Sequence, residues 1–445
     1  MSFGSGIPRL VRSLFVSLSC LCAVSACGTD ARTKPLASAP VASPSASAAL
    51  PRSTKVMLGV DTLASGGFAQ LKGKRVGLLT HPAGVNRDGR STIDVLRSAP
   101  GVRLVALYGP EHGIYGDEAA NVPVANRTDK RTGLPVYSLY GTYRKPTPAM
   151  IKGIDVMVVD LQDLGVRSYT YVSCLRKVME ACFEAGKEVV VLDRPNPLGG
   201  LKVDGPSREA AFDSYVGAYP VPYVHGLTIG ELARMAKATP GWLDAKPDVV
   251  RRGRLTVVPM QGWRRSMLWS NTGLRWIPTS PGIPNEAAAF GYAMTGLGTQ
   301  IGGFSHGYGT PYSFRLIVHN RRTPEQVKAA FDALRIPGLS FQIMETKNSS
   351  GRPLRGNFVR ITDWGRMRPT ELSFHMMNLS AQWDGNPFKR AGVTDVDLFN
   401  KHTGEGFVLR DLRANGRLDM VGCLARWKAS CQAFQGRSRP YWLYD

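Results

Sequence analysis

Short, continuous apolar runs alternate with helical periodicity along the first half of the chain. The runs are rich in Val and Leu and cover residues 75–80, 103–108, 155–160 and 188–193. Amphipathic helical patterns occur between runs, at 91–98 and 173–185. Strands that are apolar at every position are typical of a parallel sheet with helices on both faces. The pattern predicts a Rossmann-like α/β domain, and because no GxGxxG motif follows the first run, dinucleotide binding has no support.

The pattern changes after a segment rich in Pro and Gly at 278–285, which is the best candidate for a domain boundary. Beyond it, strand-like pieces mix with helical ones, at 313–319, 323–334, 357–362, 369–383 and 418–434. This mixture predicts a smaller α+β domain. We therefore expect the Rossmann-like domain to cover 55–285 and the C-terminal domain to cover 286–445.

The start of one helix follows directly from its side chains. Thr228 and Glu231 have the spacing of a capping box, in which a hydroxyl and a carboxylate bind the free amide groups of the first helical turn. We therefore expect Glu231 to be a cap rather than a catalyst.

The first 26 residues have the features of a secretory signal peptide. They contain no acidic residue, and Arg9 and Arg12 precede an apolar run at 14–24. The Val-Ser-Ala-Cys sequence that ends at Cys27 resembles a bacterial lipobox, which predicts that Cys27 is lipidated and anchors the protein to a membrane. The alternatives are an ordinary signal peptide cut near Ala26 or an uncleaved anchor.

The composition of the chain limits where the protein can act and which partners it can bind. Residues 27–54 are rich in Ala, Ser and Pro, which predicts a flexible tether between the membrane and the folded body. Hydrophobic residues make up 43% of the chain, which excludes wholesale disorder. The formal charge is 56 − 34 = +22, and removal of 1–26 with its two arginines leaves +20 on an exported, periplasmic or surface body. Export excludes intracellular nucleic acid and makes the cell wall the nearby polyanion.

The cysteines and histidines signal no metal site or cofactor. Cys174 and Cys182 are eight residues apart in a helical pattern, about 12 Å of axial rise, which a disulfide cannot span. Cys423 and Cys431 could pair if the segment between them turns back. No CxxC or HExxH pattern is present, so a metal-dependent hydrolase has little support.

Polar side chains cluster where the apolar runs end. In an open parallel sheet, ligands bind beyond the carboxyl ends of the strands. The residues at three such ends are Glu111, His112, Asp160, Gln162, Asp163, Arg167, Asp193, Arg194 and Asn196. Carboxylates for acid–base work, amides for hydroxyl groups and the neighbouring tyrosines suit a carbohydrate.

The motifs that carry these residues resemble a known family. They read GPEHG, DLQDLGVRSYTY, DRPNPLGG, YPVPYVHGLTIGELA and WIPTSPGIPN, with TGLPVYSLYG and RKPTP after the first. In this order they resemble the NamZ-type exo-β-N-acetylmuramidases, a glycoside hydrolase family, over roughly residues 56–444. The resemblance implies an exported bacterial enzyme that removes N-acetylmuramic acid from the non-reducing ends of peptidoglycan fragments, without a cofactor.

The resemblance assigns candidate catalytic residues. Glu111 is the expected general acid that protonates the glycosidic oxygen, and the alternative is that it braces the turn after its strand. Asp160 and Asp163 are rivals for the second carboxylate role, and one of them is expected only to bond backbone amides of the loop. His112 is either a ligand contact or a loop histidine.

Further positions are expected to bind the substrate. Arg167 fits the lactyl carboxylate of muramic acid, with a salt bridge to Asp163 as the alternative. Tyr169 and Tyr171 alternate along an extended segment, so at most one is expected to face the substrate. Gln162 and Asn196 suit sugar hydroxyls, and His225 either points into the cleft or makes a structural hydrogen bond.

Two motifs depart from the family pattern. This chain has His81 and Pro82 where the family has the Asn and Gln of TNQTG. It has His306 and Tyr308 where the family pattern is close to the Glu and Arg of SEGRGT. His306 could keep an acid–base or binding function, because imidazole titrates near neutrality. These departures motivate an alternative function, a catalytically silent peptidoglycan-binding lipoprotein.

Overall fold

The structure is a computed structural model that describes residues 56–118 and 124–445. The predicted signal peptide, the lipidation site Cys27 and the tether lie outside the described residues. Within the described ranges, no helix combines the length and the apolar content that a membrane crossing requires.

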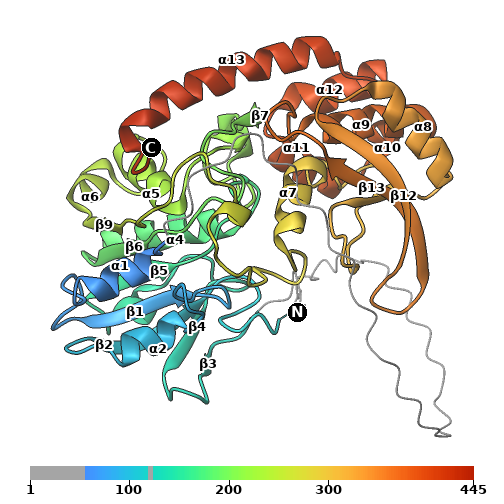
Figure 1. The fold of residues 1–445 in the computed structure, drawn as a ribbon. Coiled ribbons are helices and arrows are strands. Elements are labelled where there is room, and N and C mark those ends of the chain that lie inside the picture. Colours follow the sequence, from blue (N-terminus) through green and yellow to red (C-terminus); the bar gives the residue numbers. More distant parts are fainter. Residues whose placement is uncertain (1–55, 119–123) are drawn as a thin grey trace, which may run out of the picture. The chain divides into compact units, whose positions relative to one another are not determined.

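The N-terminal part is built on a seven-stranded sheet with the order β3-β4-β2-β1-β5-β6-β9 (Figure 1). Its strands are β1 (Arg75–Thr80), β2 (Arg103–Gly109), β3 (Arg127–Thr128), β4 (Pro135–Ser138), β5 (Val156–Asp160), β6 (Glu188–Leu192) and β9 (Leu255–Val258). All pairs are parallel except β3 with β4. The parallel strands, numbered along the chain, lie in the order 3-2-1-4-5-6 of a doubly wound sheet. The predicted Rossmann-like layout is confirmed.

Helices cover both faces of this sheet. They are α1 (Gly59–Ser65), α2 (Thr92–Arg97), α3 (Pro148–Ile151), α4 (Tyr171–Glu184), α5 (Ile229–Ala238) and α6 (Pro247–Arg252). Successive residues of β5 point to opposite faces. Val156 and Val158 pack in one buried cluster with α1 and α2, whereas Met157 and Val159 pack in another with α4 and α5. Two buried faces explain why the central strands are apolar at every position.

The C-terminal part combines a four-stranded antiparallel sheet, in the order β10-β11-β13-β12, with helices. Its strands are β10 (Phe304–Ser305), β11 (Leu316–His319), β12 (Leu339–Lys347) and β13 (Pro353–Ile361). Its helices are α7 (Glu286–Thr295), α8 (Pro324–Leu334), α9 (Glu371–Trp383), α10 (Pro387–Arg390), α11 (Val393–Thr403), α12 (Gly406–Asn415) and α13 (Met420–Ser438). The predicted α+β architecture is confirmed.

Short elements connect these two parts. They are the hairpin of β7 (Asp204–Ser207) with β8 (Pro222–Val224) and the single-turn 3-10 helices Ala210–Phe212, Trp269–Asn271 and Arg439–Tyr441. The largest buried cluster extends through both parts, and its members include Tyr169 from the N-terminal part and Trp427 from the C-terminal part. The side chain of Asn285 caps α7, accepting a hydrogen bond of 2.9 Å from the backbone N–H of Ala288. The domain boundary between 285 and 286 stays a prediction.

The cysteines of α13 do not pair. Cys423 and Cys431 both lie within this continuous helix, so the segment between them does not turn back, and both are free thiols. The same axial rise that separates the buried, free Cys174 and Cys182 on α4 separates this pair.

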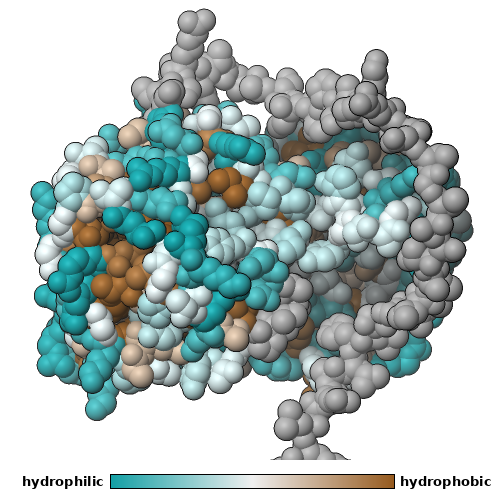
Figure 2. Space-filling model, turned by 90° about the horizontal axis from the view of Figure 1, so that it is seen from below, coloured by the Kyte–Doolittle hydropathy of each residue, from teal (hydrophilic) through white to brown (hydrophobic). Residues whose placement is uncertain are grey.

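The surface shown in Figure 2 is mostly hydrophilic, with hydrophobic residues gathered in small patches. Among the described residues, the exposed large hydrophobic side chains include three tyrosines, Tyr115, Tyr143 and Tyr308. Each of these tyrosines lies in a loop near one of the sequence motifs singled out above.

Candidate active site

Glu111 lies in the tight turn that follows β2. His112 and Gly113 have left-handed φ angles of 72° and 73°, which reverse the chain directly after the carboxylate. The Glu111 side chain is half-buried. The hydroxyl of Thr170, the residue before α4, donates a hydrogen bond of 3.2 Å to Glu111 Oε2. Glu111 is therefore held by residues from outside its own loop.

The strand register explains a second contact of Glu111. Gly109 at the end of β2 pairs with Ser138 of β4, and the N–H of Leu139 donates to the Gly109 carbonyl at 2.9 Å. This pairing brings Tyr140, the next residue, beside Glu111, where the phenol hydrogen bonds to the carboxylate. Burial, together with the nearby negative charge, raises the pKa of Tyr140 to about 12. Tyr140 therefore stays protonated and can act as a donor.

The negative charge of Glu111 also affects the pKa values of three more tyrosines. They are Tyr171 at the start of α4, Tyr215 in the loop after β7 and Tyr292 on α7. Burial is the main reason that their pKa values are raised, and the negative charge of Glu111 adds to it. Because Tyr292 belongs to the C-terminal part, both parts of the chain contribute to the surroundings of Glu111.

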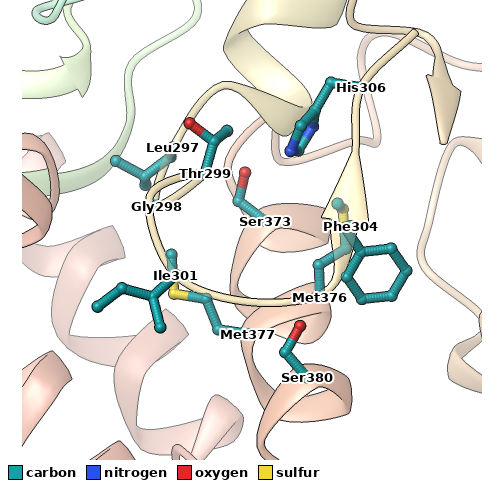
Figure 3. Close-up of a pocket in the computed structure, with 10 residues that line it drawn as sticks. All are labelled: Leu297, Gly298, Thr299, Ile301, Phe304, His306, Ser373, Met376, Met377 and Ser380. Carbon is teal, nitrogen blue, oxygen red and sulfur yellow. The ribbon is translucent and has the colours of Figure 1, made fainter. Parts of the chain in front are cut away.

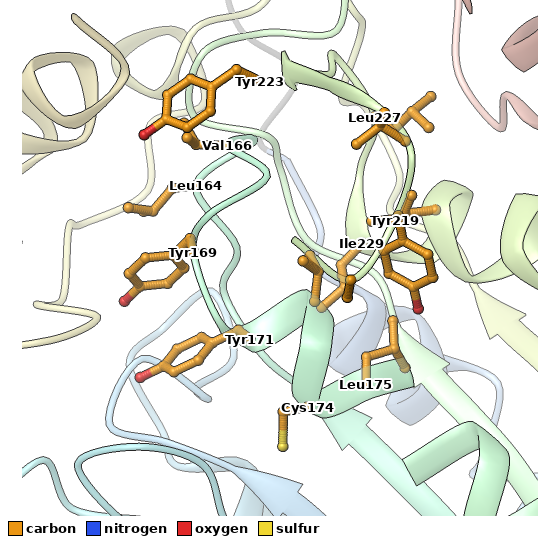
Figure 4. Close-up of a cluster of buried hydrophobic side chains, with 14 of the residues drawn as sticks. Leu164, Val166, Tyr169, Tyr171, Cys174, Leu175, Tyr219, Tyr223, Leu227 and Ile229 are labelled. Carbon is orange, nitrogen blue, oxygen red and sulfur yellow. The ribbon is translucent and has the colours of Figure 1, made fainter. Parts of the chain in front are cut away.

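Tyr169 and Tyr171 point to the same side, which differs from the expected alternation (Figure 4). The alternation would hold for an extended strand, but the chain turns at 167–170 and Tyr171 begins α4. The Tyr169 hydroxyl donates to Thr279 Oγ1 at 2.8 Å, and the Tyr171 hydroxyl donates to the Thr279 carbonyl at 2.6 Å. The two tyrosines thus tie the Pro-rich segment at 278–285 to the N-terminal part.

Asp163 is a buried carboxylate with one free oxygen. Its Oδ2 accepts a hydrogen bond of 2.8 Å from the N–H of Gly165 and lies 3.6 Å from Nε2 of His225. The N–H of Leu227 donates to Nδ1 of His225 at 3.2 Å, so in the neutral ring Nε2 carries the proton; this N–H lies near Asp163 but makes no hydrogen bond within the described residues. Among the described residues, Oδ1 of Asp163 has no hydrogen-bond partner.

Tyr292 is influenced by the charges of both Glu111 and Asp163. Burial raises its pKa to about 12, and the charges of Glu111 and Asp163 both contribute in the same direction. Its hydroxyl lies 3.0 Å from the hydroxyl of Ser168. Glu111, Asp163 and Tyr292 therefore form the candidate site, with a protonated phenol that both carboxylates influence.

Asp160, the alternative to Asp163 as the second catalytic carboxylate, has a structural role. Arg194 donates to both of its oxygens, from Nε at 2.6 Å and from Nη2 at 2.9 Å, and the Thr92 hydroxyl donates to Oδ2. The residue is fully buried. Asp193, the residue before Arg194, accepts hydrogen bonds from the Thr228 hydroxyl and the Gly230 N–H at the start of α5.

Glu231 is a cap, as predicted. The N–H of Thr228 donates to its Oε2 at 3.1 Å, and its own N–H donates to the Thr228 hydroxyl at 3.2 Å. Its Oε1 also forms a buried ion pair with Arg265 at 2.6 Å. No catalytic role for Glu231 is implied.

Gln162 and Asn196, the expected hydroxyl ligands, hold the loops instead. The side-chain amide of Gln162 donates to the carbonyls of Asp163 and Pro195, and its backbone N–H donates to Nε2 of His81 at 2.9 Å. This group occupies the position beyond β1 and β5, where the strand order reverses. Asn196 donates to the Leu227 carbonyl and accepts from the Leu198 N–H. Both side chains are buried and their amide nitrogens donate to backbone carbonyls, while Oε1 of Gln162 has no hydrogen-bond partner among the described residues.

Arg167 does not have the expected carboxylate partner. Its guanidinium is buried and donates to four carbonyl groups, those of Pro206, Val221, His402 and Thr403, at 2.7–3.1 Å. It makes no salt bridge to Asp163, because these carbonyls take both terminal nitrogens. Arg167 joins the loop after β5 to the end of α11, and these contacts give no support to the prediction that it binds the lactyl group.

His112 and His306 are placed by their loops. Nδ1 of His112 lies 2.9 Å from the Glu118 carbonyl, and its ring is buried. His306 points into a cavity of about 20 Å³ lined by Thr299, Phe304 and Ser373 among others (Figure 3). Both ring nitrogens of His306 are buried and have no hydrogen-bond partner within the described residues, and burial lowers its pKa to about 4. An acid–base or binding function for His306 stays a prediction.

Sequence reasoning missed several residues of the site. Tyr140, Thr170, Tyr215 and Tyr292 all interact with Glu111. A local signal for Tyr140 exists, because it follows the short apolar run in TGLPVYSLYG that forms β4. Tyr215 and Tyr292 come from distant segments and carry no local signal. No group of side chains in 56–118 and 124–445 has the composition of a metal site.

Comparisons with known proteins agree on one family. The family model described as exo-β-N-acetylmuramidase NamZ, N-terminal, matches residues 76–287, and its C-terminal counterpart matches 290–444. The chain is 42% identical over 409 residues to peptidoglycan β-N-acetylmuramidase NamZ of Bacillus subtilis strain 168, covering 91% of this chain and 95% of that protein.

Two crystal structures of DUF1343 family proteins from Bacteroides fragilis NCTC 9343 have the same fold. One superimposes with a TM-score of 0.79 at 38% identity and the other with 0.66 at 26%, and each covers 88% of this chain and 99% of its own. The motifs, the fold and the extent of the matches lead to one conclusion: the chain belongs to the NamZ exo-β-N-acetylmuramidase family.

Proposed function

We propose that this protein is a glycoside hydrolase that releases N-acetylmuramic acid from the non-reducing end of peptidoglycan fragments during cell-wall turnover. The observation that carries the proposal is the position of Glu111. This half-buried carboxylate at a sheet edge is held by Thr170 and Tyr140, in a chain that matches a peptidoglycan β-N-acetylmuramidase over most of its length.

Glu111 is the general acid in this proposal. In the first step it transfers its proton to the glycosidic oxygen as the bond to the anomeric carbon breaks. The hydroxyls of Thr170 and Tyr140 orient the carboxyl group, so that the proton is presented in a fixed direction.

Asp163 is the second carboxylate. Its Oδ1 is buried and has no partner in the described part of the chain, and the His225 N–H faces its other oxygen. Such a group can orient a water molecule or stabilise the positive charge that develops at the anomeric carbon. Asp160 is excluded from this role in the proposal, because Arg194 and Thr92 occupy both of its oxygens.

We infer that the enzyme acts outside the cytoplasm as a lipoprotein. The support comes from the sequence of 1–27, with two arginines, an apolar run and the lipobox-like cysteine Cys27. A tethered enzyme with a net charge of +20 would stay close to the anionic wall.

The test is release of N-acetylmuramic acid from its disaccharide with N-acetylglucosamine and from a chromogenic β-glycoside. We expect release by the wild type, a loss of about 10²- to 10⁴-fold in Glu111→Gln, and unchanged release by the control Glu184→Gln, an exposed Glu→Gln change in the ion pair with Lys145. Absence of release by the wild type, or undiminished release by Glu111→Gln, would contradict the proposal. Binding of muropeptides without turnover would instead favour the silent wall-binding lipoprotein that the replacements at His306 and Tyr308 suggested.

A further inference from the structure

The loop between β4 and α3 carries an exposed arginine beside the candidate site. The guanidinium carbon of Arg144 lies 4.5 Å from the ring centre of Tyr215 and 5.5 Å from that of Tyr140. Tyr140 hydrogen bonds to Glu111. One side chain therefore separates Arg144 from the proposed general acid.

Arg144 has no acidic partner in the described part of the chain. Among the described residues it makes no ion pair and no hydrogen bond, although its neighbour Lys145 pairs with Glu184 at 2.8 Å. The acidic residue nearest in sequence to Tyr215 is Asp213, and it is taken by Arg176 at 2.7 Å and Arg208 at 3.6 Å. The Arg144 guanidinium stacks on aromatic faces, which orients its plane and leaves its N–H edge for a ligand.

The other arginines near the strand ends cannot serve this purpose. Arg167 is buried and donates to four carbonyl groups. Arg194 is buried and committed to Asp160 and to the Val85 carbonyl. Among these three only Arg144 is exposed, and within the described residues only its two terminal guanidinium nitrogens make no hydrogen bond.

We infer that Arg144, stacked on Tyr215 and Tyr140, is the binding site for the carboxylate of the sugar that is cleaved, which in N-acetylmuramic acid is the lactyl carboxylate. This inference rests on the proposed function and specifies what that site recognises. A planar guanidinium binds a carboxylate through two parallel hydrogen bonds, a geometry that a neutral sugar cannot offer. The acidic sugar is thereby held beside Glu111.

The experiment compares a charged substrate with a neutral one. The substrates are a chromogenic β-glycoside of N-acetylmuramic acid and the methyl ester of its lactyl group. The variants are Arg144→Gln, Arg144→Lys and the control Arg103→Gln, which removes the same charge from an exposed position at the start of β2, at the opposite edge of the sheet.

We expect Arg144→Gln to lower kcat/KM for the acid by about 10- to 100-fold, as for the loss of a charge-assisted hydrogen-bonded pair. The ester should react equally well with this variant and the wild type. For the acid, kcat/KM of Arg144→Lys should lie between the values for Arg144→Gln and the wild type, because lysine keeps the charge without the planar fork. Arg103→Gln should match the wild type on both substrates.

Equal losses on acid and ester would overturn the inference, because they would mean that Arg144 only supports its two tyrosines. An unchanged rate on the acid would overturn it as well. If the wild type cleaves neither substrate, the proposed function fails, and calorimetry then decides the inference separately. In that case wild type should bind free N-acetylmuramic acid more tightly than N-acetylglucosamine and Arg144→Gln should not, and equal binding by the wild type would overturn it.

Discussion

Arg194 holds both oxygens of Asp160, with Nε 2.6 Å from Oδ1 and Nη2 2.9 Å from Oδ2. The pair joins the end of β5 to the residues after β6, and the Thr92 hydroxyl adds the start of α2. A carboxylate with both oxygens occupied in this way has a structural role. The two aspartates of the same motif, Asp160 and Asp163, therefore have different roles.

The first prediction concerns the stability that Asp160 provides. Asp160→Asn should lower the free energy of unfolding by about 3–5 kcal/mol, because it leaves the buried Arg194 guanidinium without a counter-charge. Urea denaturation at neutral pH measures this change. Asp248→Asn, in an exposed ion pair with Arg252, is the matched control and should have little effect. A folded, fully stable Asp160→Asn that has lost only its activity would instead make Asp160 the catalytic carboxylate.

Substitution of Asp163 should lower the activity and leave the fold intact, in contrast to substitution of Asp160. Asp163→Asn keeps an oxygen that can accept from the Gly165 N–H, so the fold should be retained. The negative charge is lost, and kcat should fall by about 10²- to 10⁴-fold if this carboxylate acts on water or on the developing cation. Steady-state kinetics on the chromogenic glycoside measures the change. Normal kcat in a folded Asp163→Asn would remove Asp163 from the mechanism.

His225 should act only through Asp163. Its Nε2 proton faces Oδ2 of Asp163, and the Leu227 N–H fixes the ring. His225→Phe should therefore lower kcat with little change in KM, and the same change in an Asp163→Asn background should have no further effect. A full additional loss in the double variant would show that His225 contributes independently of Asp163.

The order of strands and helices could be predicted because it depends on local periodicity. The apolar run at 155–160 and the capping box of Thr228 and Glu231 are signals contained within a few residues. The partners of Arg167 were beyond such reasoning, because two of its four carbonyl acceptors come from His402 and Thr403, more than 230 residues along the chain.

In the candidate site too, features with a local signal could be predicted, whereas contacts between distant segments could not. Glu111 could be placed because it directly follows a strand, and strand ends meet at one edge of a parallel sheet. Its contact with Tyr140 depends on the pairing of β2 with β4, a strand of only four residues with a weak signal. The predicted alternation of Tyr169 and Tyr171 fails because a helix begins at Tyr171, which ends the extended chain.

Asp193 should contribute more to the free energy of unfolding at acidic pH than at neutral pH. Burial raises the pKa of this carboxyl to about 6, above the value near 4 of the unfolded chain. The folded state then binds the proton more tightly, so the contribution is complete below about pH 4 and is lost as the pH rises through about 6. Free energies of unfolding at pH 4.5 and 7.5 measure this contribution.

Asp193→Asn removes the titrating group from that comparison. The variant should be less stable at both pH values, because an amide nitrogen replaces an acceptor for Thr228 and Tyr444. The difference in free energy of unfolding between pH 4.5 and 7.5 should nevertheless shift by about 2 kcal/mol relative to the wild type. An unchanged difference would mean that Asp193 does not titrate in this range.

His306 should have the opposite pH dependence. Burial lowers its pKa to about 4, below the value near 6.5 of an unfolded chain. The unfolded state binds the proton more tightly, so the contribution of the neutral ring is complete above about pH 6.5 and is lost as the pH falls through about 4. His306→Gln should therefore lose less stability than the wild type between pH 7.5 and 4.5, by about 2–3 kcal/mol.

His375→Gln is the control for His306, because it makes the same substitution on α9, at a side chain that does not line the cavity that His306 faces. Its loss of stability between the two pH values should match that of the wild type. Because Asp193 and His306 act in opposite directions over the same pH range, their contributions partly cancel in the wild type, and only the variants separate them. If His306→Gln and His375→Gln lose the same stability on acidification, the imidazole of His306 is accessible to protons in the folded state, and an acid–base role for it would have to be considered again.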